Sequence, residues 1–191
     1  DLDTHAEFTT ATTAIGTTPA DGVVRRSGAA PGDVLCVTGR WGRSAAALRL
    51  FDRETAEATD RANELFRFTP RVAAGRTLAE TATAMMDSSD GLARSLHQIA
   101  EASDVGIALD DRSLPAHPAV EAVTTDADEQ FEMATYFGED FELVCTLPPA
   151  AVDRARRECP VELTRIGTVR AADTGVTVDG DPLTDRGYTH G

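Results

Sequence analysis

Met85-Met86-Asp87-Ser88-Ser89-Asp90-Gly91-Leu92 carries the strongest structural signal in this chain. Two apolar residues lead into two carboxylates three positions apart, with hydroxyl groups between them and a glycine behind. Leu92, Leu96 and Ile99 then recur at helical spacing. The sequence therefore predicts a turn over residues 87–91 that opens a helix ending near Ser103.

The two carboxylates of this turn allow two interpretations. Ser or Asp before an apolar helix most often only caps its free backbone N–H groups, and one carboxylate is enough for that. Two neighbouring carboxylates repel each other unless a cation, a proton or the helix end compensates them, and oxygen ligands on a turn suit Mg²⁺ shared with substrate phosphates. By itself the stretch leaves capping and metal or phosphate binding at equal weight.

The charge of the chain restricts its partners. Asp and Glu number 32 against 18 basic residues, every one of them Arg, and the net charge is −14. Such a charge opposes binding to nucleic acid or to an anionic membrane. Acidic residues occur throughout and Lys is absent, from which we hypothesise a halophilic host. With no long apolar run and no signal-type N-terminus, the chain is predicted to be soluble and cytoplasmic.

The three cysteines and four histidines show no ligand-like spacing. Cys36 and Cys145 each sit in an apolar run, and with Cys159 they make an odd number. They are predicted to be reduced core residues rather than metal ligands or nucleophiles. The histidines are scattered, so neither a zinc site nor a catalytic triad is predicted.

Around the central stretch the pattern predicts alternating helices and strands. Pro70 can begin a helix, and Asp179-Gly180 is typical of a tight hairpin turn. The loop at 39–44 is predicted to be a structural turn, since its glycine spacing fits no known phosphate loop. The predicted strands are 34–38, 105–109, one starting near 141, 163–169 and 175–178, and the predicted helices are 45–51, 55–66, 71–83 and 150–159.

Other charged residues are open to a structural and a functional interpretation. Arg25 and Arg26 are either a solvated face or phosphate ligands. Glu139 and Asp140, at the mouth of a strand, are either ordinary turn acids or site residues. Residues 8–15 are predicted to be a strand. Because this strand lies so close to the start of the chain, the chain is expected to be cut from a longer one.

An ordered set of motifs is more specific than any one of them. The motifs are Arg-Ser-Gly-Ala-x-Pro-Gly-Asp (26–33), Val-Thr-Gly (37–39), Thr-Pro-Arg (69–71), Asp-x-Ser-Asp-Gly-Leu (87–92) and Gly-Glu-Asp-Phe-Glu-Leu (138–143). Taken together they resemble the thiamine-monophosphate kinase family, of the superfamily that includes aminoimidazole-ribonucleotide synthetase, over essentially the whole chain.

The resemblance implies a fold and an activity. The expected fold is α/β, a mixed, largely antiparallel sheet with packed helices, over residues 21–191. Residues 1–20 would be the last strand of a missing N-terminal domain that binds ATP and metal and forms the homodimer. The implied reaction is Mg²⁺-dependent phosphorylation of thiamine monophosphate by ATP, an in-line transfer that relies on positioning and charge neutralisation.

The resemblance also implies roles for individual residues. It makes Asp87 and Asp90 metal ligands, together with Asp1 or Asp3. The other implied contacts are ATP at Arg26 and Ser89, and the thiamine substrate at Glu139 and Tyr188. No residue is assigned as nucleophile or base.

Departures from the family pattern keep alternatives open. Arg43 stands where the family often has Asp, and Ser88 where an aliphatic residue is usual. Without its N-terminal domain the chain alone is expected to have little or no kinase activity. The alternatives are another ATP-using synthetase or maturation protein of the superfamily, and a non-catalytic ligand-binding domain.

Overall fold

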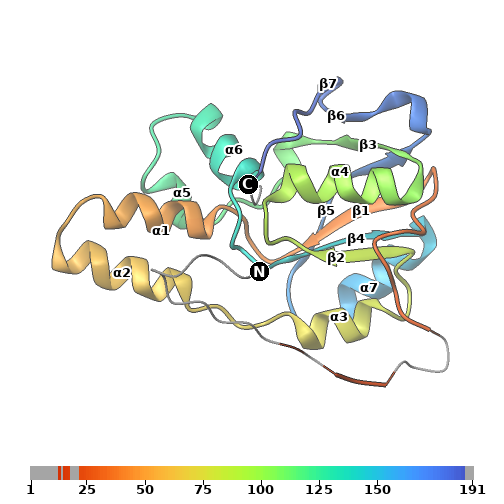
Figure 1. Cartoon of the computed structure of the whole chain (residues 1–191), viewed down its shortest axis with the longest axis horizontal. Coiled ribbons are helices and arrows are strands. Elements are labelled where there is room, and N and C mark those ends of the chain that lie inside the picture. The colour runs from red at the N-terminus through yellow and green to blue at the C-terminus, as the bar shows by residue number, and fades with distance from the viewer. Residues whose placement is uncertain (1–12, 14, 18–21, 188–191) are drawn as a thin grey trace.

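The chain forms a mixed, largely antiparallel sheet with helices packed against it (Figure 1), which confirms the predicted fold class. The computed structural model describes residue 13, residues 15–17 and residues 22–187. Within this part the sheet has seven strands in the order β2-β4-β1-β5-β3-β6-β7, and only β3 and β6 pair in parallel. The strands are β1 (Val34–Thr38), β2 (Ala84–Asp87), β3 (Gly106–Leu109), β4 (Leu143–Leu147), β5 (Leu163–Arg170), β6 (Val176–Val178) and β7 (Asp181–Pro182).

The helices fall into three groups. One face of the sheet packs against α4, and the other packs against α3 and α7. The remaining helices, α1, α2, α5 and α6, share an Ala-rich core of their own at one end of the sheet (Figure 1). The bounds are α1 (Arg43–Phe51), α2 (Ala56–Phe66), α3 (Val72–Leu78), α4 (Leu92–Ser103), α5 (Pro118–Glu121), α6 (Ala127–Tyr136) and α7 (Val152–Glu158).

The central strand β1 shows why the sheet is layered in this way. Leu35 and Val37 pack into the core under α4, whereas Val34 and Cys36 pack into the core under α3 and α7. Successive side chains of a strand point to opposite faces, so a fully apolar strand has to be covered on both sides.

The segment before Asp87 differs from the prediction. The helix expected over 71–83 ends at Leu78, and Ala84–Asp87 forms an edge strand that pairs with β4. The Thr83 N–H already donates to the carbonyl of Thr146 in β4. Pairing with a distant strand therefore overrides the local helical pattern of this segment. The helix after Gly91 is confirmed as α4.

Several smaller predictions are confirmed. Asp179 and Gly180 connect β6 to β7 with φ of 49° and 96°, the left-handed pair of a two-residue hairpin. Cys36 and Cys145 are free and fully buried, and burial raises the pKa of Cys36 to about 12. The sequence left Trp41, in the loop at 39–44, open between packing and ligand contact, and in the structure its side chain is fully buried in the core.

Two further predictions concern the N-terminus and membranes. The strand predicted over residues 8–15 lies mostly outside the described residues, and so do residues 1–12, 14 and 18–20 of the predicted first domain. No helix in the described part of the chain has the length and apolarity needed to cross a bilayer.

His117 is the residue from which we expect the fold to be sensitive to acid. Its Nδ1 accepts a hydrogen bond from the Ala119 N–H and caps α5, which requires a neutral ring. Burial, and then repulsion by Arg43, Arg61 and Arg40, lowers the pKa of His117 from its ordinary 6.5. A lowered folded pKa contributes stability that is present above pH 6.5 and is lost as the pH falls through the folded value.

We therefore expect the free energy of unfolding to decrease by about 1 kcal/mol, the worth of one helix cap, as acid protonates His117. The measurement is urea unfolding between pH 7.5 and pH 5, compared with His117→Asn, which caps without titrating. Subtracting the two curves isolates this histidine. Parallel curves would contradict the prediction.

Candidate functional site

Two turns that are distant in the sequence lie side by side at one end of the sheet. The turn after β2 and the turn before β4 continue the pairing of these strands. The Ser88 N–H donates to the Glu142 carbonyl at 2.9 Å, and the Phe141 N–H donates back to the Ser88 carbonyl at 3.1 Å. The Glu139 N–H donates to the Ser89 carbonyl at 2.8 Å. The Asp-x-Ser-Asp-Gly-Leu and Gly-Glu-Asp-Phe-Glu-Leu motifs therefore form one unit.

Glycine is required at two points of this unit. Gly91 has φ of 107°, and a Cβ there would lie 3.0 Å from the Tyr136 carbonyl oxygen. A Cβ on Gly138 would collide with the Ser89 carbonyl oxygen. Only a residue without a side chain allows such a close backbone approach, which explains the glycine in each motif.

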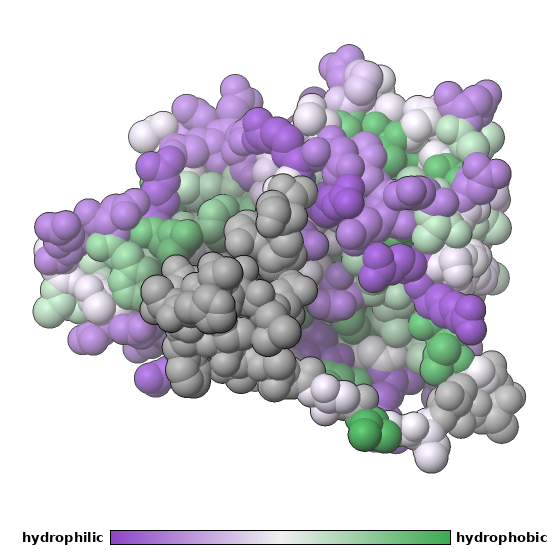
Figure 2. Space-filling view, in the orientation of Figure 1, coloured by the Kyte–Doolittle hydropathy of each residue, from purple (hydrophilic) through white to green (hydrophobic). Residues whose placement is uncertain are grey.

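The turn that follows β2 separates two cavities. The larger, of about 700 Å³, is lined on this side by Ser89, Asp90 and Glu139 and on the helical side by Leu48 and Phe66. The smaller, of about 360 Å³, has a mostly apolar lining that includes Asp87. Asp87 and Asp90, the two acidic residues here, thus line different cavities. Over the whole molecule, Figure 2 shows a largely hydrophilic surface with apolar patches over the helices at its left.

A buried ion pair braces the same unit. The Arg71 guanidinium donates Nε to Oε2 of Glu142 at 2.7 Å and Nη2 to Oε1 at 2.5 Å, and the Glu142 side chain is only 4% exposed. The Thr38 hydroxyl donates to the same carboxylate at 2.7 Å and accepts from the Leu143 N–H at 2.8 Å. The Val-Thr-Gly and Thr-Pro-Arg motifs therefore meet the third motif at Glu142.

Asp140 forms a second brace, on the side of α1. Its buried carboxylate accepts from the Gly42 N–H at 2.5 Å and from the Ser44 N–H at 3.0 Å, so it caps a helix that has no side-chain cap of its own. Burial raises the pKa of Asp140, whereas the two N–H donors and Arg43 act in the opposite direction. Sequence reasoning left Asp140 as a candidate turn acid and missed the structural role of Glu142.

The other predicted site residues lie elsewhere. Arg26 is exposed on the segment beside the start of β2, where the Ser103 hydroxyl donates to its carbonyl at 3.3 Å. Arg26 is not among the residues that line either cavity of the turn. Asp1, Asp3 and Tyr188 are outside the described residues.

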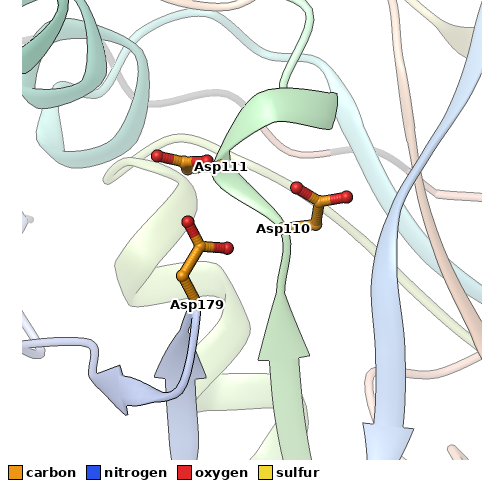
Figure 3. A group of neighbouring side chains, drawn as sticks. All are labelled: Asp110, Asp111 and Asp179. Carbon is orange, nitrogen blue, oxygen red and sulfur yellow. The ribbon is translucent and has the colours of Figure 1, made fainter.

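A separate acidic group lies at the far side of the sheet. Asp110 and Asp111 follow β3 and Asp179 follows its parallel neighbour β6, so the three exposed carboxylates come together (Figure 3), with oxygens within 4.8 Å of one another. Desolvation and a hydrogen bond with Asp179 raise the pKa of Asp111. Among the described residues no group of three ligands this close includes Asp87 or Asp90. Sequence analysis did not identify this cluster, because the parallel pairing of β3 with β6 brings its residues together.

The fold and motifs correspond to a known family. The family described as AIR synthase related protein, C-terminal domain, matches residues 30–179. The chain therefore belongs to this family and carries its C-terminal domain.

Its relatives include thiamine-monophosphate kinases. That of Halobacterium salinarum is 57% identical over 190 residues, which cover 100% of this chain and 63% of the relative. The chain thus spans less than two thirds of that length.

Solved structures agree. The thiamine-monophosphate kinase of Stenotrophomonas maltophilia matches with a TM-score of 0.74 and 33% identity, over 83% of this chain and 53% of that one. AaThiL complexed with AMPPCP and TMP matches with a TM-score of 0.73 and 29% identity, over 87% and 54%.

Proposed function

We propose that this chain supplies the C-terminal part of an enzyme that phosphorylates thiamine monophosphate to thiamine diphosphate with ATP. The observation that carries the proposal is the pair of hydrogen-bonded turns, which places Asp90, Ser89 and Glu139 on one cavity. It is supported by 57% identity to a thiamine-monophosphate kinase and by the likeness to AaThiL complexed with AMPPCP and TMP. ATP and thiamine monophosphate are then the two substrates.

Asp87 and Asp90 line different cavities, so each would supply one carboxylate to Mg²⁺, and neither belongs to a complete metal site within the described residues. Mg²⁺ in phosphoryl-transfer enzymes is held by one or two carboxylates and completes its coordination with water and substrate phosphates. Asp87 is exposed and Asp90 half-buried on a turn whose backbone is held by hydrogen bonds. When bound, the ion would neutralise phosphate charge. We also propose that residues 1–20 are the last strand of a preceding domain. Asp1 or Asp3 in this segment would add a further ligand to the ion.

The remaining residues would orient the two substrates. Ser89 and Arg26 would contact ATP, and Glu139 and Tyr188 would contact thiamine monophosphate. With the acceptor phosphate and the γ-phosphoryl group aligned, transfer needs no covalent enzyme intermediate, because positioning and charge neutralisation supply the catalysis.

The test is an assay of thiamine diphosphate formation from thiamine monophosphate, ATP and Mg²⁺ in high KCl. It is run on the 191-residue chain and on the chain extended to the length of its relatives. Turnover in the extended chain, with little in the shorter one, is the expected result. No turnover in either, with both folded by circular dichroism, would contradict the proposed reaction.

We further infer a cytoplasmic enzyme adapted to high salt, dimeric through its N-terminal domain and without nucleic-acid or membrane partners. At a net charge of −14, the acidic side chains repel one another most strongly when the salt concentration is low. Raising KCl from 0.1 M to 2 M screens this repulsion and is expected to raise the midpoint of thermal unfolding by about 5 °C or more. Differential scanning calorimetry measures the unfolding midpoint in KCl, and the same series in NaCl serves as the matched salt. An unchanged midpoint would remove the inference of halophilic adaptation.

A further inference from the structure

The backbone on either side of Asp140 has an uncommon conformation. Glu139 and Phe141 have φ of 70° and 51°, in the left-handed region. Neither is a residue that adopts this region readily, so the surrounding structure has to hold them there. Such conformations cluster at ligand-binding sites, and Glu139 lines the 700 Å³ cavity.

The first residues of α1 hold this segment in place, although Ser44 lies 95 residues before Glu139 in the sequence. The Ser44 hydroxyl donates to the Glu139 carbonyl at 2.6 Å, and its N–H donates to the Asp140 carboxylate at 3.0 Å. The Arg43 guanidinium donates to the Asp140 carbonyl at 3.1 Å. Ser44 is fully buried, and Asp140 is 2% exposed. Two of these bonds reach backbone carbonyls and the third reaches the Asp140 carboxylate, while the Glu139 side chain stays exposed.

Aromatic stacking supports the other end of the same segment. The Phe68 ring stacks on Phe141 at a centroid distance of 5.1 Å, and the Arg43 guanidinium lies 5.1 Å from the centroid of Phe68. Arg43 therefore contacts the Asp140 backbone and also the ring that stacks on Phe141. This gives a structural reason for the arginine at a position where the family pattern has Asp.

We propose that Ser44 is a positioning residue for Glu139. By fixing the Glu139 carbonyl, it aims the carboxylate at the larger cavity and ties it to α1, whose Leu48 lines the same cavity. Only the choice of thiamine monophosphate as ligand rests on the proposed function. The positioning itself is a property of the turn.

The first test needs no ligand. Ser44→Ala removes the hydroxyl and keeps the N–H bond to Asp140. Loss of this bond is expected to speed hydrogen exchange at the Glu139 and Phe141 amides by about tenfold, while β4 exchanges as in the wild type. Ser113→Ala, on a distant turn, is the matched control. Equal acceleration in β4, or none at the turn, would overturn the proposal.

The second test is a double-mutant cycle for thiamine monophosphate affinity, measured by calorimetry in the extended chain. Ser44→Ala is expected to weaken binding about fivefold to tenfold in the wild-type background and less than about twofold in Glu139→Gln, because a positioning residue acts through the group that it positions. Equal weakening in both backgrounds would show a general packing role and overturn the proposal. If wild-type protein does not bind, the proposed function fails and the exchange experiment alone judges Ser44.

Discussion

Arg71→Met is expected to lower the free energy of unfolding by about 3 kcal/mol, the largest stability change predicted for this protein. The substitution keeps most of the side-chain volume but leaves Glu142, 4% exposed, without its two hydrogen bonds from the guanidinium. An unpaired buried carboxylate is costly because the ion has lost its water without gaining a counter-charge. Urea unfolding at pH 7 measures the change.

Two further variants make this prediction specific. Arg61→Met removes an exposed ion pair with Glu64 on α2 and is expected to cost no more than about 0.5 kcal/mol. The double variant Arg71→Met/Glu142→Leu replaces both charges with apolar groups and is expected to recover most of the loss. If Arg71→Met costs no more than Arg61→Met, the ion pair does not stabilise the fold.

Asp87→Asn is expected to reduce turnover in the extended chain by a hundredfold or more while leaving the unfolding midpoint unchanged. The exposed side chain at the end of β2 keeps its shape but loses the charge that would hold a cation against transferred phosphate. Loss of one group that stabilises transition-state charge typically costs about 10²-fold to 10³-fold. Steady-state kinetics with varied Mg²⁺ should also show a weaker apparent affinity for the ion.

Asp179→Asn is the matched control for this substitution. It removes one carboxylate from the other acidic group, and Asn before Gly suits the left-handed hairpin turn at φ of 49°. Turnover is expected to stay within about twofold of the wild type, the range of a surface substitution. A large loss in Asp179→Asn with full activity in Asp87→Asn would move the metal site to the Asp110, Asp111 and Asp179 group.

The sequence alone was sufficient for elements with strong local signals. The strand over 34–38, the helix over 55–66 and the Asp179-Gly180 hairpin were all predicted where the structure has β1, α2 and the β6–β7 turn, to within one residue. Each depends on the preferences of neighbouring residues, which a short window contains. The same holds for the turn before α4, whose glycine and helical spacing made it the most prominent candidate site.

Local pattern failed where a distant partner determined the outcome. Residues 79–83 look helical, yet β4 draws the segment that follows into the sheet. The convergence of Thr38, Arg71 and Glu142, and the hold of Ser44 on Glu139, join residues 71 to 104 positions apart. Nothing in a short window encodes such contacts.

The sequence by itself was therefore enough to identify the charge of the chain, most of its helices and strands, and the residues that could carry chemistry. Only the tertiary structure decided which of these residues meet. The physical reason is that strand order and helix packing bring side chains together across the sheet, and these depend on burial of the whole apolar core rather than on local sequence.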